Sequence, residues 1–134
     1  MKTVEEILNN SRIVAMVGLS ANPDRPSHIV ASYLKEHGYK IIPVNPTEKR
    51  ILGQKSYPDL TSIPGKVDVV DIFRRSEDVP PIVRDAIKIG AKAVWMQEGV
   101  INKEAAAEAR KAGLKVVMNK CMRKQHIKLH GGSE

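Results

Sequence analysis

The stretch VGLSANPDRPSH, residues 17–28, has the residue types and spacing of a phosphate-binding turn. Gly18 allows a tight turn, Ser20 offers a hydroxyl group, and Pro26 suits the first turn of a helix. The free N–H groups at the start of such a helix bind anions. The same residues also fit an ordinary strand-to-helix connection with a polar cap residue, and spacing alone favours neither interpretation.

A second cluster of polar residues ends the next predicted strand, where Val44, Asn45 and Pro46 are followed by Lys49 and Arg50. Folds that bind NAD usually carry an Asp or Glu here, which holds the ribose hydroxyl groups. A cationic end accepts a phosphorylated ribose instead, which favours NADP or coenzyme A. Because the phosphate turn has one glycine where a dinucleotide fold has three, coenzyme A is favoured over NADP. Lys49 and Arg50 individually also fit a solvated basic loop.

Two adjacent arginines, Arg74 and Arg75, end the third predicted strand. Guanidinium groups bind phosphate with two parallel hydrogen bonds, so this pair points to an anionic ligand. Because side chains alternate along a strand, we expect only Arg74 to face the ligand. Arg75 is expected to be a surface ion-pair partner.

The elements that must position these residues are short apolar runs alternating with helical stretches. Strands are predicted at 12–18, 39–44, 67–73, 91–97 and 114–120, and helices at 3–10, 27–37, 79–89 and 103–112. Strands rich in Val and Ile and separated by helices indicate a parallel sheet covered on both faces. We therefore expect an α/β, doubly wound, Rossmann-like fold with five strands in the order 3-2-1-4-5. Residues 45–66 are expected to form a surface loop with at most a small hairpin or a short helix.

The carboxyl ends of parallel strands share one edge of a sheet, where ligands bind. The fourth strand brings Gln97, Glu98 and Gly99 to this edge, and the fifth brings Cys121. None of the four histidines is paired with Cys or a carboxylate at metal-ligand spacing, and the sequence has neither a nucleophile elbow nor a P-loop. We expect no metal and no catalytic residue.

Length and composition predict one domain over residues 1–134, with a core at about 12–121 and a basic tail at 122–134. The net charge of +7 favours an anionic partner, although a basic tail is more often a solvated end. No apolar run reaches the roughly 18 residues of a membrane span, and no signal peptide is evident. With its single cysteine, the chain is expected in the cytoplasm and away from membranes. The lack of a helix-turn-helix, aromatic stacking strip or zinc knuckle argues against nucleic acid.

The segments VGLSANPDRPSH, IPVNP, VDVVDIFRR, AVWMQEGV and MNKC occur in this order across residues 12–121. Together they resemble the small single-domain CoA-binding protein family, whose fold is similar to the amino-terminal domain of the succinyl-CoA synthetase alpha subunit. The resemblance implies a domain that holds coenzyme A, with the ADP part near the first two strands and pantetheine toward the last two. It implies cofactor contacts at Gly18, Ser20, Arg25, Val44, Asn45, Pro46, Lys49, Arg74, Gln97, Glu98 and Gly99.

As a function, the resemblance implies a non-catalytic carrier, sensor or regulatory module for coenzyme A or an acyl-CoA, with a protein partner or a second copy of the chain as further partners. The alternative is an enzyme that uses NADP or an acyl-CoA, either a reductase or an acyltransferase. Synthetase chemistry is not implied, because the synthetase subunit continues into a domain with a phosphohistidine and no histidine here has a matching context. Cys121 either approaches the CoA thiol or serves as a small buried apolar residue.

Overall fold

The computed structural model describes residues 2–132, in which helices and strands alternate as the apolar periodicity predicts. The α-helices are α1 (Lys2–Asn10), α2 (Pro26–Glu36), α3 (Val79–Lys88), α4 (Lys103–Lys111) and α5 (Met122–Leu129). The strands are β1 (Ile13–Val17), β2 (Lys40–Val44), β3 (Arg50–Ile51), β4 (Gln54–Lys55), β5 (Val69–Ile72), β6 (Ala93–Met96) and β7 (Lys115–Val117). Short 3₁₀ turns occupy Leu60–Ser62 and Ser76–Asp78. Within this range no helix has the length and apolarity needed to cross a membrane.

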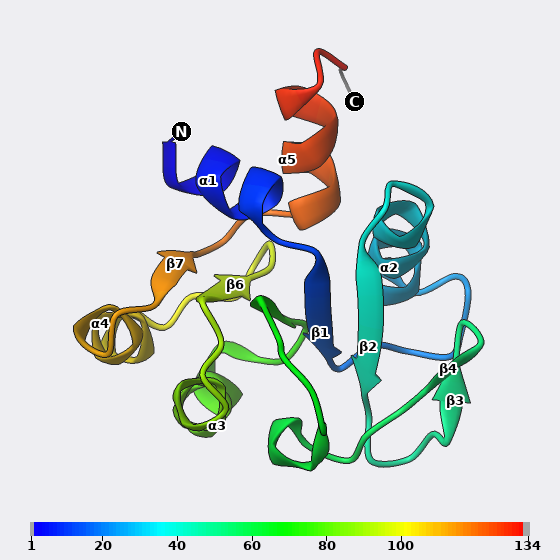
Figure 1. Cartoon of the computed structure of the whole chain (residues 1–134), viewed down its shortest axis with the longest axis horizontal. Coiled ribbons are helices and arrows are strands. Elements are labelled where there is room, and N and C mark those ends of the chain that lie inside the picture. Colours follow the sequence, from blue (N-terminus) through cyan, green and yellow to red (C-terminus); the bar gives the residue numbers. More distant parts are fainter. Residues whose placement is uncertain (1, 133–134) are drawn as a thin grey trace.

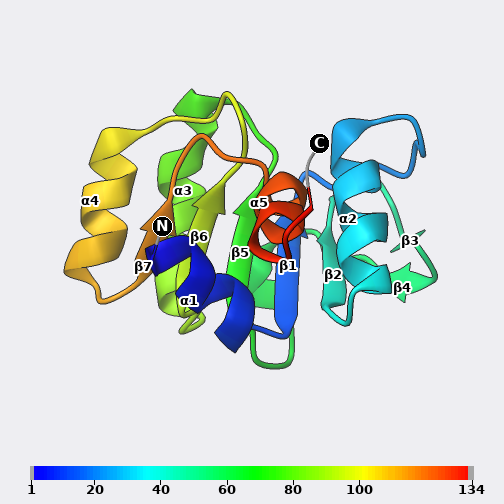
Figure 2. The same ribbon diagram turned by 90° about the horizontal axis from the view of Figure 1, so that it is seen from above.

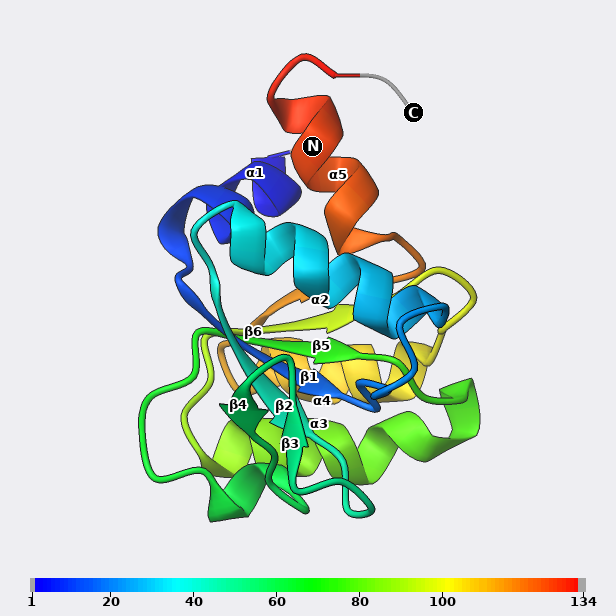
Figure 3. The ribbon, with the colours of Figure 1, turned by 90° about the vertical axis from the view of Figure 1, so that its right-hand side faces the viewer.

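A parallel sheet of five strands forms the middle of three layers (Figures 1 and 3). Helices α1, α2 and α5 cover one face, and α3 and α4 cover the other (Figure 3). The sheet has a separate hydrophobic core on each face, because successive residues of a strand point to opposite faces. Val69 of β5 packs in the core beneath α1, α2 and α5, and Val70 packs in the core beneath α3 and α4. Burial on both faces explains why these strands are continuously apolar in sequence.

The strands lie in the order β2-β1-β5-β6-β7. The doubly wound parallel fold is confirmed, but the predicted order 3-2-1-4-5 is wrong in one respect: the third large strand, β5, lies beside β1 and not outside β2. Pro43 gives the physical reason. Proline has no N–H to donate to a neighbouring strand, so a strand that contains it belongs at a sheet edge. On that outer side the Pro43 carbonyl accepts a hydrogen bond from the N–H of Tyr57, at 3.0 Å.

The segment between β2 and β5 carries the β3–β4 hairpin and one 3₁₀ turn, as expected for residues 45–66. The segment expected as a basic tail differs, because its described part forms α5, which lies between α1 and α2 (Figure 2). Met122 and His126 are buried, and Leu129 packs against the same core. These residues recur at helical spacing, so α5 has one buried face although it is rich in lysine.

Candidate functional site

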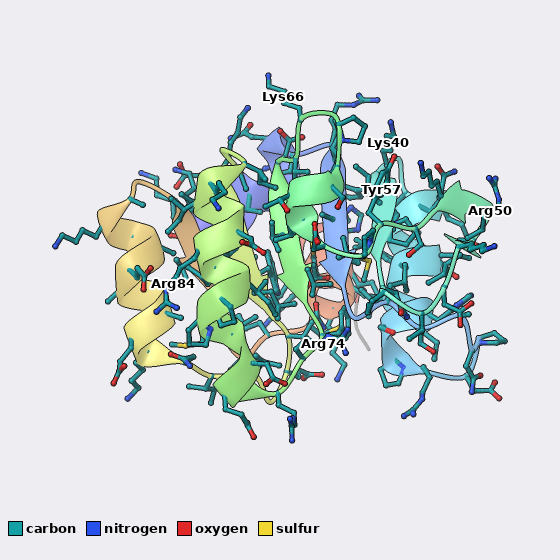
Figure 4. All side chains as sticks on the ribbon, turned by 90° about the horizontal axis from the view of Figure 1, so that it is seen from below. Lys40, Arg50, Tyr57, Lys66, Arg74 and Arg84 are labelled. Carbon is teal, nitrogen blue, oxygen red and sulfur yellow. The ribbon has the colours of Figure 1, made fainter. Side chains whose placement is uncertain are left out.

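A cleft of about 780 Å³ opens at the carboxyl ends of β1, β5 and β6. The chain runs from β1 outward to β2 and then returns past β1 to β5, so the connections on the two sides of this point diverge. Such a reversal of strand order leaves a crevice in which doubly wound folds bind ligands. Figure 4 shows Arg74 at this end of the sheet, opposite the end that carries Lys40 and Lys66.

Gly18 forms the floor of the cleft where the backbone leaving β1 passes the end of β5. Its φ is +90°, and a β-carbon at this position would overlap the carbonyl oxygen of Phe73. Its N–H donates a hydrogen bond to the carbonyl of Val44, at 3.0 Å. Glycine is therefore required here both for its backbone conformation and for its lack of a side chain.

The turn that follows Gly18 is fastened to the start of α2. The N–H of Ser20 donates to the Ser27 hydroxyl at 3.0 Å, and the carbonyl of Ser20 lies 2.9 Å from Nδ1 of His28. Pro26 occupies the first turn of the helix, and Arg25 at the N-cap position makes no capping bond with its side chain. At the start of α2 the N–H of Arg25 donates to the carbonyl of Asn22 and that of His28 to the carbonyl of Arg25, and Pro26 has no N–H. The backbone donor that α2 offers the cleft is therefore the N–H of Ser27, and donors at helix starts bind anions.

Three arginines line the cleft: Arg25, Arg74 and Arg75. Among residues 2–132, neither Arg25 nor Arg74 takes part in an ion pair, whereas Nε of Arg75 lies 3.2 Å from a carboxylate oxygen of Asp78. The ion pair predicted for Arg75 is confirmed. Both adjacent arginines line the cleft, because β5 ends at Ile72 and strand alternation does not extend to them, and the expectation that Arg74 is the one that faces the ligand stays a prediction.

The far wall of the cleft is built from two segments distant in sequence, residues 97–99 and 119–124. Oε1 of Gln97 accepts a hydrogen bond from the N–H of Met122, at 3.1 Å. Gln97 is only 4% exposed and lines the cleft. Because its oxygen is occupied, its side-chain NH₂ group remains as the donor for a ligand.

Further contacts tie the same two segments together. The N–H of Gly99 donates to Oδ1 of Asn119 at 2.7 Å, and Asn119 holds a left-handed backbone with φ of +61°. Nζ of Lys124 lies 3.1 Å from Oε1 of Glu98. The wall therefore depends on α5 and on the turn before it as much as on β6.

The structure brings part of the predicted site together in this cleft, namely Gly18, Ser20, Arg25, Arg74, Gln97 and Glu98. Val44 and Pro46 line an adjoining hollow of about 200 Å³ that shares Arg74 with the cleft. Asn45, Lys49 and Gly99 line neither space. Asn45 has a structural contact instead, because its side-chain NH₂ donates to the carbonyl of Leu19 at 3.0 Å.

The cleft is also lined by Pro26, Ser27, Val30, Phe73, Asp78, Val100 and Cys121, of which the sequence places Pro26 at the phosphate turn and Cys121 at the ligand edge of the sheet. The first three share one side of the first turns of α2, which the predicted helix start could have indicated. Phe73 directly precedes the arginines and follows the end of β5. No feature of the sequence places Asp78 and Val100 at the cleft, because turns of the backbone bring them there.

Asp71 lies two residues before Phe73 in chain order, below the cleft floor, between Met16 of β1 and Trp95 of β6. Its side chain is wholly buried, and neither carboxylate oxygen makes a well-formed hydrogen bond. Burial raises the pKa of Asp71 well above its ordinary value, and a weak contact with the N–H of Ile72 opposes this shift only in part. Within residues 2–132, no group of three or more His, Cys, Asp or Glu side chains is arranged to hold a metal ion.

Comparisons with known proteins identify relatives over nearly the whole chain. The CoA binding domain family matches residues 12–127. The protein YneT of Bacillus subtilis (strain 168) is 41% identical over 123 residues, which cover 92% of this chain and 91% of YneT. A solved structure of a protein from Pyrococcus horikoshii OT3 superposes with a TM-score of 0.93 at 44% identity, covering 97% of this chain and 92% of that one.

A longer relative is the Pyrococcus furiosus acetate–CoA ligase (ADP-forming) II subunit alpha, which is 29% identical over 124 residues. The match covers 84% of this chain but 27% of the subunit. This chain therefore corresponds to one part of that larger protein.

Proposed function

We propose that this chain, which belongs to the family of CoA binding domains, holds coenzyme A in the cleft at the carboxyl edge of its sheet. The observation that carries the proposal is the anion site on the cleft floor. There Gly18 has no side chain, the N–H of Ser27 at the start of α2 borders the cleft, and among residues 2–132 neither Arg25 nor Arg74 forms an ion pair. Backbone donors and arginine forks of this kind hold a pyrophosphate.

The two ends of the cleft suggest how the cofactor lies. The adenosine part extends toward the hollow of Val44 and Pro46, which shares Arg74 with the cleft. Pantetheine then runs along the far wall to Cys121, which is 7% exposed and lines the cleft. Pantetheine contains two amide groups, and the NH₂ group of Gln97 is placed to donate to one of their carbonyls.

The end of β2 supports coenzyme A over NAD. No carboxylate follows β2 at the position that would hold the ribose hydroxyl groups, and Asn45 is already bonded to Leu19 and Thr47. The cationic residues after β2 do not reach the cleft. Arg50 instead donates to the carbonyl of Gly53 within the hairpin, at 2.6 Å, and lies far from Arg74 (Figure 4).

We further propose that the chain acts on its own as a carrier, sensor or regulatory module and not as a catalyst. The carboxylates that line the cleft support this role, because Asp78 is paired with Arg75 and Glu98 with Lys124. Neither Asp78 nor Glu98 is placed to act as a general base beside a nucleophile. The P. furiosus relative is a ligase subunit, and the region that matches this chain makes up 27% of that subunit. The lone reduced thiol of Cys121 supports a cytoplasmic location.

Isothermal titration with coenzyme A, NADP and NAD tests the ligand. We expect coenzyme A to bind most tightly, and NADP binding of equal or greater affinity would overturn the proposal. Incubation with acetyl-CoA and succinyl-CoA tests the non-catalytic role. Steady hydrolysis that disappears in Glu98→Gln would show that the chain is an enzyme.

A further inference from the structure

Helices α2 and α5 are joined by a group of ring side chains that we call the histidine cluster: Tyr33, His37, His126 and His130. The hydroxyl of Tyr33 lies 2.8 Å from Nδ1 of His126. The rings of His126 and His130 are 4.4 Å apart between centroids, and those of His37 and His126 are 5.3 Å apart. Tyr33 stacks on His37 at 4.0 Å. Three imidazoles therefore meet at one helix–helix contact.

The surroundings of His126 disfavour positive charge. Burial lowers the pKa of His126, and the neighbouring His130 and His37 lower it further. The edge of the Tyr39 ring also faces His126, and the guanidinium of Arg123 lies over the ring of Tyr33 at 5.5 Å. A proton added to His126 would thus be buried beside two other imidazoles and near the guanidinium of Arg123.

Among residues 2–132, no carboxylate forms an ion pair with a histidine of the cluster, and neither Glu36 of α2 nor Glu5 of α1 forms an ion pair at all. The sequence of α5, MRKQHIKL, contains no acidic residue. Helix α1 also packs against α5, but it turns Val4 and Leu8 to the core, and its Glu6 forms an ion pair with Lys115. Glu98 is paired with Lys124, in the first turn of α5.

The histidine cluster lies on the two helices that border the cleft. Helix α5 begins at the far wall, where the N–H of Met122 bonds to Gln97, and His126 follows one helical turn later. Helix α2 begins at the anion site with Ser27 and reaches Tyr33 after further turns. Figures 2 and 3 show the two helices side by side over the sheet. A contact that holds α5 against α2 therefore also supports the far wall.

We propose that the histidine cluster is an acid-sensitive latch, which holds α5 against α2 at neutral pH and releases α5 when the buried His126 is protonated, so that the far wall of the cleft loosens. The sign follows from proton linkage. A solvated imidazole has a pKa of about 6.5, so the docked form, in which protonation is opposed, binds fewer protons than the released form. Docking is fully effective above about pH 6.5 and weakens as the pH falls below it.

Hydrogen exchange of the full chain at pH 7.5 and 5.5 tests the release of α5, after correction for the intrinsic pH dependence of exchange. We expect the protection factors of residues 122–129 to fall at least tenfold more than those of α3, a helix of similar length on the other face. In the double variant His37→Gln/His130→Gln, which changes two exposed side chains, this excess should shrink at least threefold. Equal changes in α5 and α3, or in wild type and variant, would overturn the latch.

Coenzyme A titrations at the same two pH values test the link to the cleft, which rests on the proposed function. The phosphate of the cofactor itself titrates near pH 6, so the comparison with His37→Gln/His130→Gln is needed. We expect the loss of affinity at pH 5.5 to be at least threefold larger in wild type than in the variant. Release of α5 without this excess would overturn the link.

His28 is the control histidine, because its Nδ1 contacts the carbonyl of Ser20 at the anion site. The variant His28→Gln should lose as much coenzyme A affinity at pH 5.5 as the wild type does. If His28→Gln removes the excess loss and His37→Gln/His130→Gln does not, the latch is wrong. If coenzyme A binds at neither pH, the proposed function fails, and the exchange of α5 still decides whether the latch exists.

Discussion

The backbone of Gly18 and the carbonyl oxygen of Phe73 lie so close that no β-carbon fits between them. We therefore expect Gly18→Ala to force the ends of β1 and β5 apart and to weaken coenzyme A binding at least tenfold. Its free energy of unfolding should fall by about 2–4 kcal/mol, since both backbone strain and steric overlap contribute. Urea denaturation and isothermal titration measure the two effects.

Gly113→Ala is the matched control for that substitution. Gly113 has a similar φ of +92°, but a β-carbon there would meet no atom within 4 Å. Gly113→Ala should lower the free energy of unfolding by about 1–2 kcal/mol, which is the strain of the left-handed conformation alone. It should leave the affinity for coenzyme A unchanged. Equal costs for the two variants would show that the approach to Phe73 is not tight.

Arg74→Ala should weaken coenzyme A binding by about 10- to 100-fold, because a charge-assisted hydrogen bond contributes roughly 1.5–3 kcal/mol. Arg75→Ala should change the affinity less than about threefold, because the exposed Arg75 already pairs with Asp78. Titration of both variants gives the answer. A larger loss in Arg75→Ala would mean that the phosphate lies on the other side of the cleft mouth.

Asp71→Asn should raise the melting temperature at pH 7.5. Burial raises the pKa of Asp71 in the folded chain, whereas the unfolded pKa is about 3.9. Its contribution to stability is therefore fully present below about pH 4 and is lost as the pH rises toward the folded pKa. The advantage of Asn should shrink as the pH is lowered from 7.5 to 4.

Asp68→Asn should have the opposite effect and lower the melting temperature at pH 7.5. Burial of Asp68 acts to raise its pKa, but hydrogen bonds from the N–H groups of Arg12 and Ile13 and the charges of Lys92 and Lys66 outweigh it and lower the pKa. The wild type should thus lose stability as the pH falls toward the folded pKa of Asp68, and Asn should be destabilising at pH 7.5. Thermal melts of both variants across this range compare the signs directly.

Cys121 should form a mixed disulfide with coenzyme A when the two are treated with diamide. The thiol lines the cleft where pantetheine would end, and diamide accepts the two thiol hydrogens as the sulfur–sulfur bond forms. Intact mass should show a single adduct of coenzyme A less two hydrogens, absent from Cys121→Ser. An adduct in that variant, or none in wild type, would place the cofactor thiol elsewhere.

Most of the fold could be predicted from sequence because both faces of the sheet are buried. Each strand is therefore a continuous run of apolar residues, mostly Val and Ile. The helices end as expected near Gly38, Gly90 and Gly113, all with positive φ. The strand order failed although Pro43 carried the signal for an edge strand. The lysines of α5 are typical of a solvated tail, whereas the helical spacing of Met122, His126 and Leu129 indicates a packed helix.

The candidate site was predictable where it follows a strand directly, as at Gly18 and Arg74. It was less predictable where turns bring residues in, because the arginine pair lies beyond the end of β5 and loses strand alternation. The role of Asn119 could not be predicted, since its bond to Gly99 joins residues that only the folded turns bring together.

The far wall also sets the order in which the cleft is completed during synthesis. Translation proceeds from the N-terminus, so the segments that supply Gly18, Arg25 and Arg74 emerge well before residues 119–124. A nascent chain can assemble the arginine side of the cleft while the opposite wall still lacks the contacts to Gln97 and Gly99. A ligand held between both sides therefore stabilises the finished polypeptide and gives little help to the growing one.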